Sequence, residues 1–276
     1  MKPGVRAAVL VVTLAVVGYG GYRLVHHELQ PVIPAIVTRT ADAHRLLSGT
    51  LGARIDRFLH DRPPPLEARA GNPRLVALTF DDGPYPVETP LLLDVLAELH
   101  VPATFFLIGN DAREFPALAR RIERDGHEIA NHTETHPGDF QALSPAEVTA
   151  ELSTGAATLE GIVRDPAIRT MMRPPHGRFT EETVRTAQRD GYDVILWDDD
   201  PGDWRSSLPG DLVSHMAAHA TAPDIILLHS GKLATIEALP GVVARFRAAG
   251  FSFVTVGALL ARVPVSQILH PAKLRV

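Results

Sequence analysis

Cysteine is absent from the 276-residue chain. Without it the protein can form neither disulfide bonds nor thiolate metal sites, so any metal must be held by histidine and carboxylate side chains. An excess of basic residues is also lacking, since 27 Lys and Arg stand against 32 Asp and Glu, for a net charge of −5. Because nucleic-acid-binding domains usually carry a basic face, this balance argues against a nucleic-acid partner.

Two further absences concern the fold. No glycine-rich phosphate-binding loop follows the first predicted strand, where a dinucleotide-binding fold would place one. The chain also has no short internal repeat. Hydrophobic residues make up 45% and charged residues 21% of the sequence, which is typical of an ordinary globular protein with a sizeable core.

An uncharged apolar run lies close to the amino terminus. Lys2 and Arg6 precede residues 7–22, which are rich in Val, Leu and Ala. A helix extended to Val25 would be roughly 28 Å long, close to the ~30 Å hydrocarbon core of a bilayer. We therefore expect residues 1–25 to be an uncleaved membrane anchor, with the remainder outside the cytoplasm. A cleavable signal peptide, which would make the protein secreted, is the alternative.

The rest of the chain divides at a proline-rich segment. Residues 26–72 end in three consecutive prolines and a polar stretch, which is typical of a stalk and stiff linker. Over residues 73–276, short β-rich runs alternate with helical segments about seven times. This alternation predicts a single α/β domain with parallel strands and covering helices. We favour a barrel, with fewer than eight strands, over an open doubly wound sheet.

The predicted elements are short. Strands are expected at 75–80, 104–108, 127–131, 170–173, 194–197, 225–228 and 251–256. Helices are expected at 90–99, 116–124, 145–163, 181–189, 212–220 and 236–248. Ser144 followed by Glu147 predicts a capping box at the start of the third of these helices.

Ionisable side chains follow five of the predicted strands directly. Parallel barrels assemble their active sites at the carboxyl ends of the strands, so these side chains are expected to meet there. The five strings are 79–84 (TFDDGP), 132–137 (HTETHP), 173–177 (RPPHG), 198–204 (DDDPGDW) and 229–231 (HSG). Their residue types are those that perform hydrolysis.

The second string contains a candidate metal-binding pair. His132 and His136 are four residues apart, and on a helical turn their side chains would share one face. One aspartate of the Asp81-Asp82 pair would complete a two-histidine, one-carboxylate site with open positions for water and substrate. The other aspartate would then be available as a general base, because adjacent side chains diverge.

Two other groups extend this chemistry. Arg173 could keep the base ionised and oriented, and the late His229 could protonate the leaving group. His215 and His219 repeat the four-residue spacing. Since no carboxylate-bearing loop is evident near them, we interpret that pair as part of a helix surface.

The five strings resemble, in order, the five motifs of the NodB-type polysaccharide deacetylases, carbohydrate esterase family four. The fourth motif is matched over 200–204 and the fifth over 227–229, so the resemblance spans residues 79 to 229. It implies a distorted, incomplete (β/α) barrel of about seven strands. It also implies a metal-dependent hydrolase that removes N-acetyl groups from a polysaccharide containing N-acetylglucosamine, such as peptidoglycan, a chitin-like polymer or an exopolysaccharide.

The resemblance further implies proton-transfer roles. Asp81 would be the general base, positioned by Arg173. His229 would be the general acid, tuned by Asp200.

The ligands of a divalent metal, most simply Zn2+ with Co2+, Ni2+ or Mn2+ as alternatives, would be Asp82, His132 and His136. By the same resemblance, Trp204 and Leu227 would wall the pocket for the acetyl methyl group. A backbone N–H near His176 would stabilise the oxyanion together with the metal.

Two positions depart from the family pattern. His176 stands where tyrosine is common, and Glu134 replaces a residue that is often aromatic; both departures bear on substrate choice. Three other functions stay open: a non-haem iron oxygenase, a deacylase of a lipid-linked sugar, and an inactive relative that binds glycan. The oxygenase would leave Asp81, Arg173 and His229 without a task. The expected partners are an acetylated polysaccharide and the membrane, and no protein partner is indicated.

Overall fold

The computed structural model describes residues 74–205 and 208–262. The anchor expected at 1–25 and the linker expected at 26–72 lie outside the described residues, so both stay predictions. Among the helices that are described, none combines the length and the apolar character that crossing a bilayer requires.

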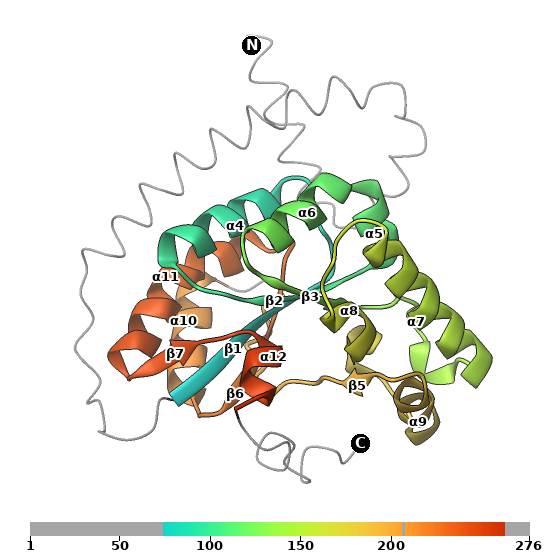
Figure 1. Ribbon diagram of the computed structural model, residues 1–276. Coiled ribbons are helices and arrows are strands. Elements are labelled where there is room, and N and C mark those ends of the chain that lie inside the picture. Colours follow the sequence, from blue (N-terminus) through green and yellow to red (C-terminus); the bar gives the residue numbers. More distant parts are fainter. Residues whose placement is uncertain (1–73, 206–207, 263–276) are drawn as a thin grey trace, which may run out of the picture. The chain divides into compact units, whose positions relative to one another are not determined.

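A curled, parallel sheet of seven strands forms the centre of the described domain (Figure 1). The strand order is β5-β4-β3-β2-β1-β6, and β7 pairs with β1. The strands are β1 (Arg74–Asp81), β2 (Thr104–Leu107), β3 (Glu128–Asn131), β4 (Met171–Met172), β5 (Asp193–Val194), β6 (Asp224–His229) and β7 (Phe251–Phe253). Each overlaps a predicted strand, and all of the pairings are parallel, which confirms the parallel α/β architecture.

The sheet curls until its two edges nearly meet. After β5, the N–H of Ile195 still donates to the carbonyl of Met172 in β4, at 2.8 Å. Four residues later the carbonyl of Asp199 accepts the N–H of Leu227 in β6, at 2.9 Å, and an isolated bridge pairs Asp199 with Ile226. The segment after β5 therefore spans the gap between the edge strands, and the result is a half-barrel of the incomplete kind that was predicted.

Helices surround this sheet (Figure 1). They are α4 (Glu88–Leu99), α5 (Gly109–Glu114), α6 (Pro116–Arg124), α7 (Pro145–Glu160), α8 (Ala167–Thr170), α9 (Glu181–Arg189), α10 (Pro209–His219), α11 (Leu233–Ala248) and α12 (Val256–Leu260). The predicted capping box is present, because Ser144 Oγ accepts the N–H of Glu147 while the Glu147 carboxylate accepts the N–H of Ser144. The last predicted strand was too long: β7 ends at Phe253, and Thr255 caps α12 instead.

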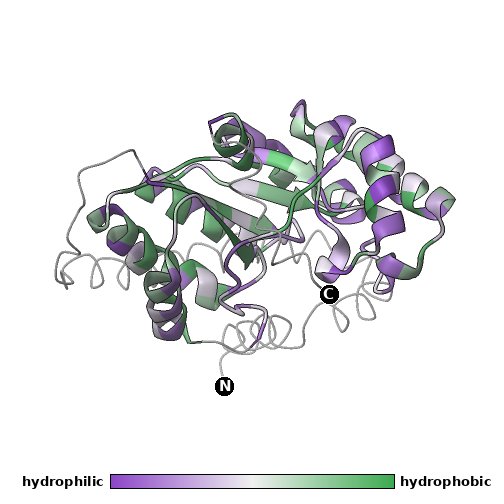
Figure 2. Ribbon diagram, turned by 90° about the horizontal axis from the view of Figure 1, so that it is seen from below, coloured by the Kyte–Doolittle hydropathy of each residue, from purple (hydrophilic) through white to green (hydrophobic). Residues whose placement is uncertain are grey.

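Apolar side chains fill the interior of the curled sheet away from the carboxyl ends of its strands. Ala77 of β1 and its neighbour Ile225 of β6 are at most 3% exposed, and both belong to a cluster that includes Phe106. Val256 and Leu259 of α12 pack into the same cluster. Figure 2 shows green, hydrophobic stretches on strands of the sheet, and green and purple stretches that alternate along the surrounding helices. Because apolar side chains fill this part of the interior, the polar groups are left to the carboxyl ends of the strands.

His127, at the opposite end of the sheet from those carboxyl ends, makes stability depend on pH. Burial lowers the pKa of His127 to about 4, and its Nδ1 accepts the N–H of Ala103 at 3.2 Å. Since the unfolded chain has the ordinary pKa of about 6.5, it binds more protons than the folded chain between these values, and stability falls as pH falls. A pKa shift of this size corresponds to a loss in the free energy of unfolding on the order of 3 kcal/mol.

We therefore expect His127→Asn, whose carbonyl can accept the same N–H, to flatten the pH dependence of unfolding. Urea midpoints of the wild type and the variant, measured from pH 7 to pH 4, test this. Parallel pH dependences in the two proteins would show that His127 does not titrate on unfolding.

Candidate active site

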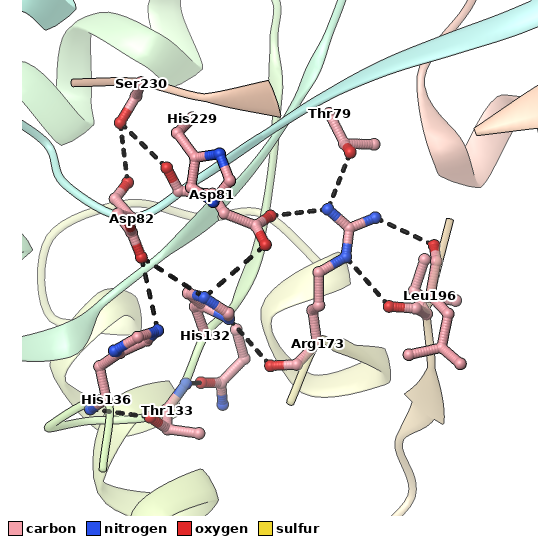
Figure 3. Close-up of polar contacts among 12 residues, drawn as sticks. Thr79, Asp81, Asp82, His132, Thr133, His136, Arg173, Leu196, His229 and Ser230 are labelled. Carbon is pink, nitrogen blue, oxygen red and sulfur yellow. Dashed lines mark hydrogen bonds and ion pairs between the residues drawn. The ribbon is translucent and has the colours of Figure 1, made fainter. Parts of the chain in front are cut away.

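Most of the side chains predicted to meet at the strand ends lie together there, namely those of Asp81, Asp82, His132, His136, Arg173 and His229 (Figure 3). Asp81 ends β1 and lies in register with His229, which ends β6. The N–H of His132 extends the β2–β3 pairing to the carbonyl of Leu107, and the N–H of Arg173 extends the β3–β4 pairing to that of Asn131, each at 3.0 Å. Parallel pairing thus brings residues almost 150 positions apart in the sequence to one end of the sheet.

Asp82, His132 and His136 form the cluster that could hold a metal ion. Their candidate ligand atoms all lie within 4.8 Å of one another, and among the described residues no other group of three qualifies. Asp82 Oδ1 is 3.6 Å from His132 Nε2 and 3.5 Å from His136 Nε2. These three residues are the predicted ligands.

The hydrogen bonding of His132 suits metal ligation. Its Nδ1 lies 2.9 Å from the carbonyl oxygen of Arg173, and because a carbonyl can only accept, Nδ1 carries the proton. Nε2 faces Asp82 and is the nitrogen left for a metal ion, which would replace the proton that Asp81 and Asp82 favour there by raising the pKa of His132. A second ring nitrogen bonded to the protein is the usual arrangement for a metal-bound histidine. Two imidazole nitrogens and one carboxylate oxygen therefore fit a divalent metal such as zinc.

The prediction that His132 and His136 share a helical turn is wrong. The segment is a bend in which Thr133 and His136 have left-handed φ values of 68° and 53°. Thr133 Oγ1 accepts the N–H of His136 at 3.0 Å, and Asn131 Oδ1 accepts the N–H of Thr133 at 2.8 Å. The two rings still lie 4.8 Å apart, so the residues are close for a different reason.

Unusual backbone conformations gather at this site. Of the five described non-glycine residues with positive φ, all but His100 belong to the strings that carry the site: Asp82, Thr133, His136 and His176. Such conformations cost free energy and persist only where the surroundings enforce them. At Asp82 the hydroxyl of Ser230 lies 3.0 Å from the Asp82 carbonyl and 3.2 Å from that of Asp81, and it can donate to either (Figure 3).

Arg173 holds Asp81 as predicted. It is fully buried, and its Nη1 donates to Asp81 Oδ1 at 2.6 Å and to Thr79 Oγ1 at 2.8 Å. Nε and Nη2 donate to the carbonyls of Ile195 and Leu196, each at 3.1 Å. With four partners and no exposure, the guanidinium fixes one oxygen of Asp81. The other, Oδ2, faces His132 Nε2 at 3.8 Å.

The partner of His229 is Asp203, which corrects the prediction of Asp200. Asp203 Oδ1 lies 2.7 Å from His229 Nδ1, and Asp203 Oδ2 accepts the backbone N–H of His229 at 2.8 Å. Asp200 turns back on its own loop instead, where Oδ1 accepts the N–H of Gly202 and Oδ2 that of the Trp204 indole. The sequence offered a signal for Asp203 in its place directly before Trp204, within the same acidic run.

The pKa values of the histidines suit their surroundings. Burial and the neighbouring His132 lower the pKa of His136 to about 4, so its ring is neutral and able to bind a metal at neutral pH. Burial acts against the charge on His229, but the bond to Asp203 and the negative potential of Asp82 and Asp81 raise its pKa to about 9. For Asp82, burial raises the pKa of the carboxyl, but the hydrogen bond to His132 and the positive charge of that ring outweigh it and hold the pKa below its ordinary value.

Of the predicted pocket residues, His176 contacts the cluster directly. The ring of His176 packs edge-on against that of His136, with 4.6 Å between centroids. Leu227 is buried in β6, and Trp204 is 48% exposed with the guanidinium of Arg205 stacked 4.4 Å from its ring. His176 and Trp204 are therefore accessible to a substrate, whereas Leu227 could contribute only to the floor of the site.

Glu134 does not face the substrate side, contrary to expectation. Its side chain is 8% exposed and pairs with Arg113 of α5. Gly109 makes room for it, because a Cβ there would collide with the carboxylate. Glu134 thus anchors the bend between the two histidines to α5, and it cannot select substrates by direct contact.

The second histidine pair has a carboxylate partner that the sequence did not reveal. His215 Nε2 lies 2.8 Å from Asp199 Oδ1, and His219 Nδ1 bonds the carbonyl of His215. No third ligand completes a metal-binding group there among residues 74–205 and 208–262. We keep the interpretation of His215 and His219 as part of a helix surface. The expectation that no carboxylate lies near them was wrong.

Comparison with known proteins gives a consistent result. A sequence model described as polysaccharide deacetylase matches residues 68–195. The chain is 35% identical over 194 residues to a peptidoglycan-N-acetylglucosamine deacetylase of Bacillus cereus, covering 68% of this chain and 89% of that protein. It is 42% identical over 158 residues to a chitooligosaccharide deacetylase of Bradyrhizobium sp., covering 57% and 71% respectively.

A solved structure is similar as well. A pseudoenzyme of carbohydrate esterase family four from Bacillus anthracis matches with a TM-score of 0.64 and 27% identity, over 72% of this chain and 69% of that one. The similarity in sequence to the Bacillus cereus protein, at 35% identity, extends over most of that protein's length. The chain therefore belongs to the polysaccharide deacetylase family.

Proposed function

We propose that the protein is a metal-dependent hydrolase that removes N-acetyl groups from a polysaccharide containing N-acetylglucosamine. The observation that carries this proposal is the arrangement of two ion pairs beside the cluster of Asp82, His132 and His136. The Asp81–Arg173 pair and the His229–Asp203 pair supply a proton acceptor and a proton donor near one candidate metal site. Metal-assisted hydrolysis of an amide uses all three functions.

The chain's own residues divide the proton transfers between them. Asp81, with Oδ1 bound to Arg173, offers Oδ2 to accept a proton from the attacking water. His229, whose Nδ1 is bonded to Asp203, presents Nε2 to protonate the leaving amine. The backbone N–H of His176 is proposed to donate to the developing oxyanion. A divalent ion held by Asp82, His132 and His136 would act as Lewis acid, polarising the acetyl carbonyl and activating the water.

His229 should set the alkaline limb of activity. Because its pKa is raised to about 9, the ring stays protonated at neutral pH, and kcat/KM should fall only as pH rises through that value. Asp203→Asn removes the carboxylate that contributes most to the raised pKa. We expect this variant to move the alkaline limb towards the ordinary value of about 6.5. pH–rate profiles of the two proteins measure the shift, and an unmoved limb would assign it to another group.

The substrate proposal draws on the relatives. The names of the two curated relatives specify peptidoglycan and chitooligosaccharide, and both polymers present N-acetylglucosamine. Trp204 offers an exposed aromatic surface of the kind that packs against sugar rings. An inactive, glycan-binding relative is the second candidate, favoured by the similarity to a pseudoenzyme. Against it, the residues proposed as base, acid and metal ligands are all in place.

The location outside the cytoplasm, on a membrane anchor, is proposed from residues 7–22 and their basic flanks alone.

One experiment separates these possibilities. The purified chain is incubated with N-acetylglucosamine oligomers, peptidoglycan fragments, a lipid-linked N-acetylated sugar and fully deacetylated oligomers, and the products are examined by mass spectrometry. We expect stepwise loss of acetyl groups from the first two and no change in the last. Reaction of the lipid-linked sugar alone would favour the lipid-sugar deacylase. Binding of oligomers without any acetate release would favour the inactive relative.

A further inference from the structure

A buried threonine contacts the acid pair of the site from a neighbouring helix. Thr235 lies in the first turn of α11, and its side chain is 2% exposed. Its Oγ1 is 2.6 Å from Asp203 Oδ2, and because an ionised carboxylate can only accept, the hydroxyl donates this hydrogen bond. No motif in the sequence marks this residue.

Asp203 thereby receives three hydrogen bonds. Oδ1 accepts Nδ1–H of His229 at 2.7 Å, and Oδ2 accepts both the backbone N–H of His229 and the hydroxyl of Thr235. Asp203 itself is 1% exposed, so water cannot readily take the place of a missing donor. Of the three donors, Thr235 alone comes from an element other than the strand that carries His229.

The position of Asp203 in the chain explains why such a bond matters. Asp203 lies in the loop between β5 and α10, whereas Thr235 lies on a helix of 16 residues that packs against α10 and α4. Side chains on loops are positioned less accurately than those on helices and strands. The hydroxyl therefore ties the member of the His229–Asp203 pair that lies on a loop to a regular element.

We propose that Thr235 is a positioning residue of the active site. It holds the second oxygen of Asp203, fixes the plane of that carboxylate, and through it orients the ring of His229 towards the leaving group. The inference rests on the proposed function, in which His229 donates a proton. Thr235 does not touch the reacting atoms, so its loss should impair turnover more than binding.

Replacement by valine isolates the hydroxyl. Thr235→Val keeps the branched shape of the side chain and leaves Asp203 Oδ2 with a single donor in a buried setting. Hydrogen bonds to charged groups are stronger than neutral ones, and small displacements of a proton donor slow its reaction. We expect kcat on N-acetylglucosamine oligomers to fall about tenfold, with KM changed by less than about twofold.

Two further variants make the test specific. Thr235→Ser keeps the hydroxyl and loses the methyl group, and we expect it to retain kcat to within about threefold of the wild type. Thr186→Val is the matched control, because Thr186 is a buried helical threonine, 1% exposed, whose hydroxyl bonds Arg189 on α9. It should leave kcat unchanged.

A spectroscopic readout does not depend on activity. In proton NMR, the Nδ1–H of His229 should give a low-field resonance because it bonds a carboxylate, and His229→Gln identifies it by removal. We expect Thr235→Val to shift or broaden this resonance and Thr235→Ser to retain it, in protein with and without added zinc.

Wild-type kcat together with an unchanged resonance in Thr235→Val would overturn the inference. A fall in kcat in Thr235→Ser as large as that in Thr235→Val would also overturn the inference, since the methyl group and its packing would then account for the fall. If the wild type released no acetate while Thr235→Val altered the resonance, the proposed function would fail and the positioning of Asp203 by Thr235 would stand.

Discussion

Asp81→Asn should keep its metal and lose turnover by about 10²–10⁴-fold, the range that a general base typically contributes. The side chain is 6% exposed and salt-bridged to the fully buried Arg173, so its position is fixed by the protein rather than by the substrate. Asparagine fills the same space and still accepts from Arg173, but it cannot take a proton from water. Asp82, the carboxylate of the candidate metal cluster, is untouched.

Kinetics and elemental analysis of the same preparation test this assignment. Asp193→Asn is a suitable control, because Asp193 is an exposed aspartate at the start of β5, at the opposite end of the sheet. Asp193→Asn should leave turnover and metal content at their wild-type values. Loss of metal in Asp81→Asn with turnover in proportion to the remaining metal would exchange the roles of Asp81 and Asp82.

His132→Ala and His136→Ala should each abolish metal binding and hydrolysis. Two protein ligands remain in either variant, and a catalytic metal usually needs three to be held tightly. The two variants should differ in stability. His132 is 1% exposed and bonds the carbonyl of Arg173, so its removal also leaves a cavity and an unpaired acceptor. His136 is more exposed, and its replacement should scarcely change the unfolding temperature.

His215→Ala supplies the control for the histidine variants, because His215 stands in the other pair with four-residue spacing and has a carboxylate partner of its own. Metal content should be unchanged in it. Full occupancy in His136→Ala, with loss in His215→Ala, would move the metal site to α10.

The strands were predictable because short apolar runs of β-forming residues alternate with helical segments. Their lengths were not. β4 and β5 each comprise only two residues, against four predicted for each. After Val194 the carbonyls of Ile195 and Leu196 accept from the Arg173 guanidinium, so they are not available to a neighbouring strand. Tertiary hydrogen bonding by a single buried arginine thus ended the strand where local propensity would continue it.

The candidate site, too, was predictable in part. Order along the chain and the rule that barrels build their sites at strand ends sufficed to assemble Asp81, His132, Arg173 and His229. Spacing also brought His136 close to His132, although through a bend with left-handed residues rather than a helical turn. Spacing can establish proximity without establishing the backbone path.

The choice between Asp200 and Asp203 depended on a turn. At Gly202 the chain adopts a φ of 73°, and Asp200 caps this turn by accepting the Gly202 N–H. The reversal directs Asp203 inward to His229. Four aspartates lie in this loop, at 198–200 and 203, and the conformation of the loop decides which of them is buried against His229.

Acetate release from N-acetylglucosamine oligomers, followed with the metal content of the purified chain, tests the account most directly. We expect wild-type activity to disappear when a chelator removes the metal and to return with added Zn2+. His136→Ala should stay inactive at the same zinc concentration. Acetate release that continues at the wild-type rate with no metal detectable would contradict the assignment of Asp82, His132 and His136 as the ligands of a catalytic metal.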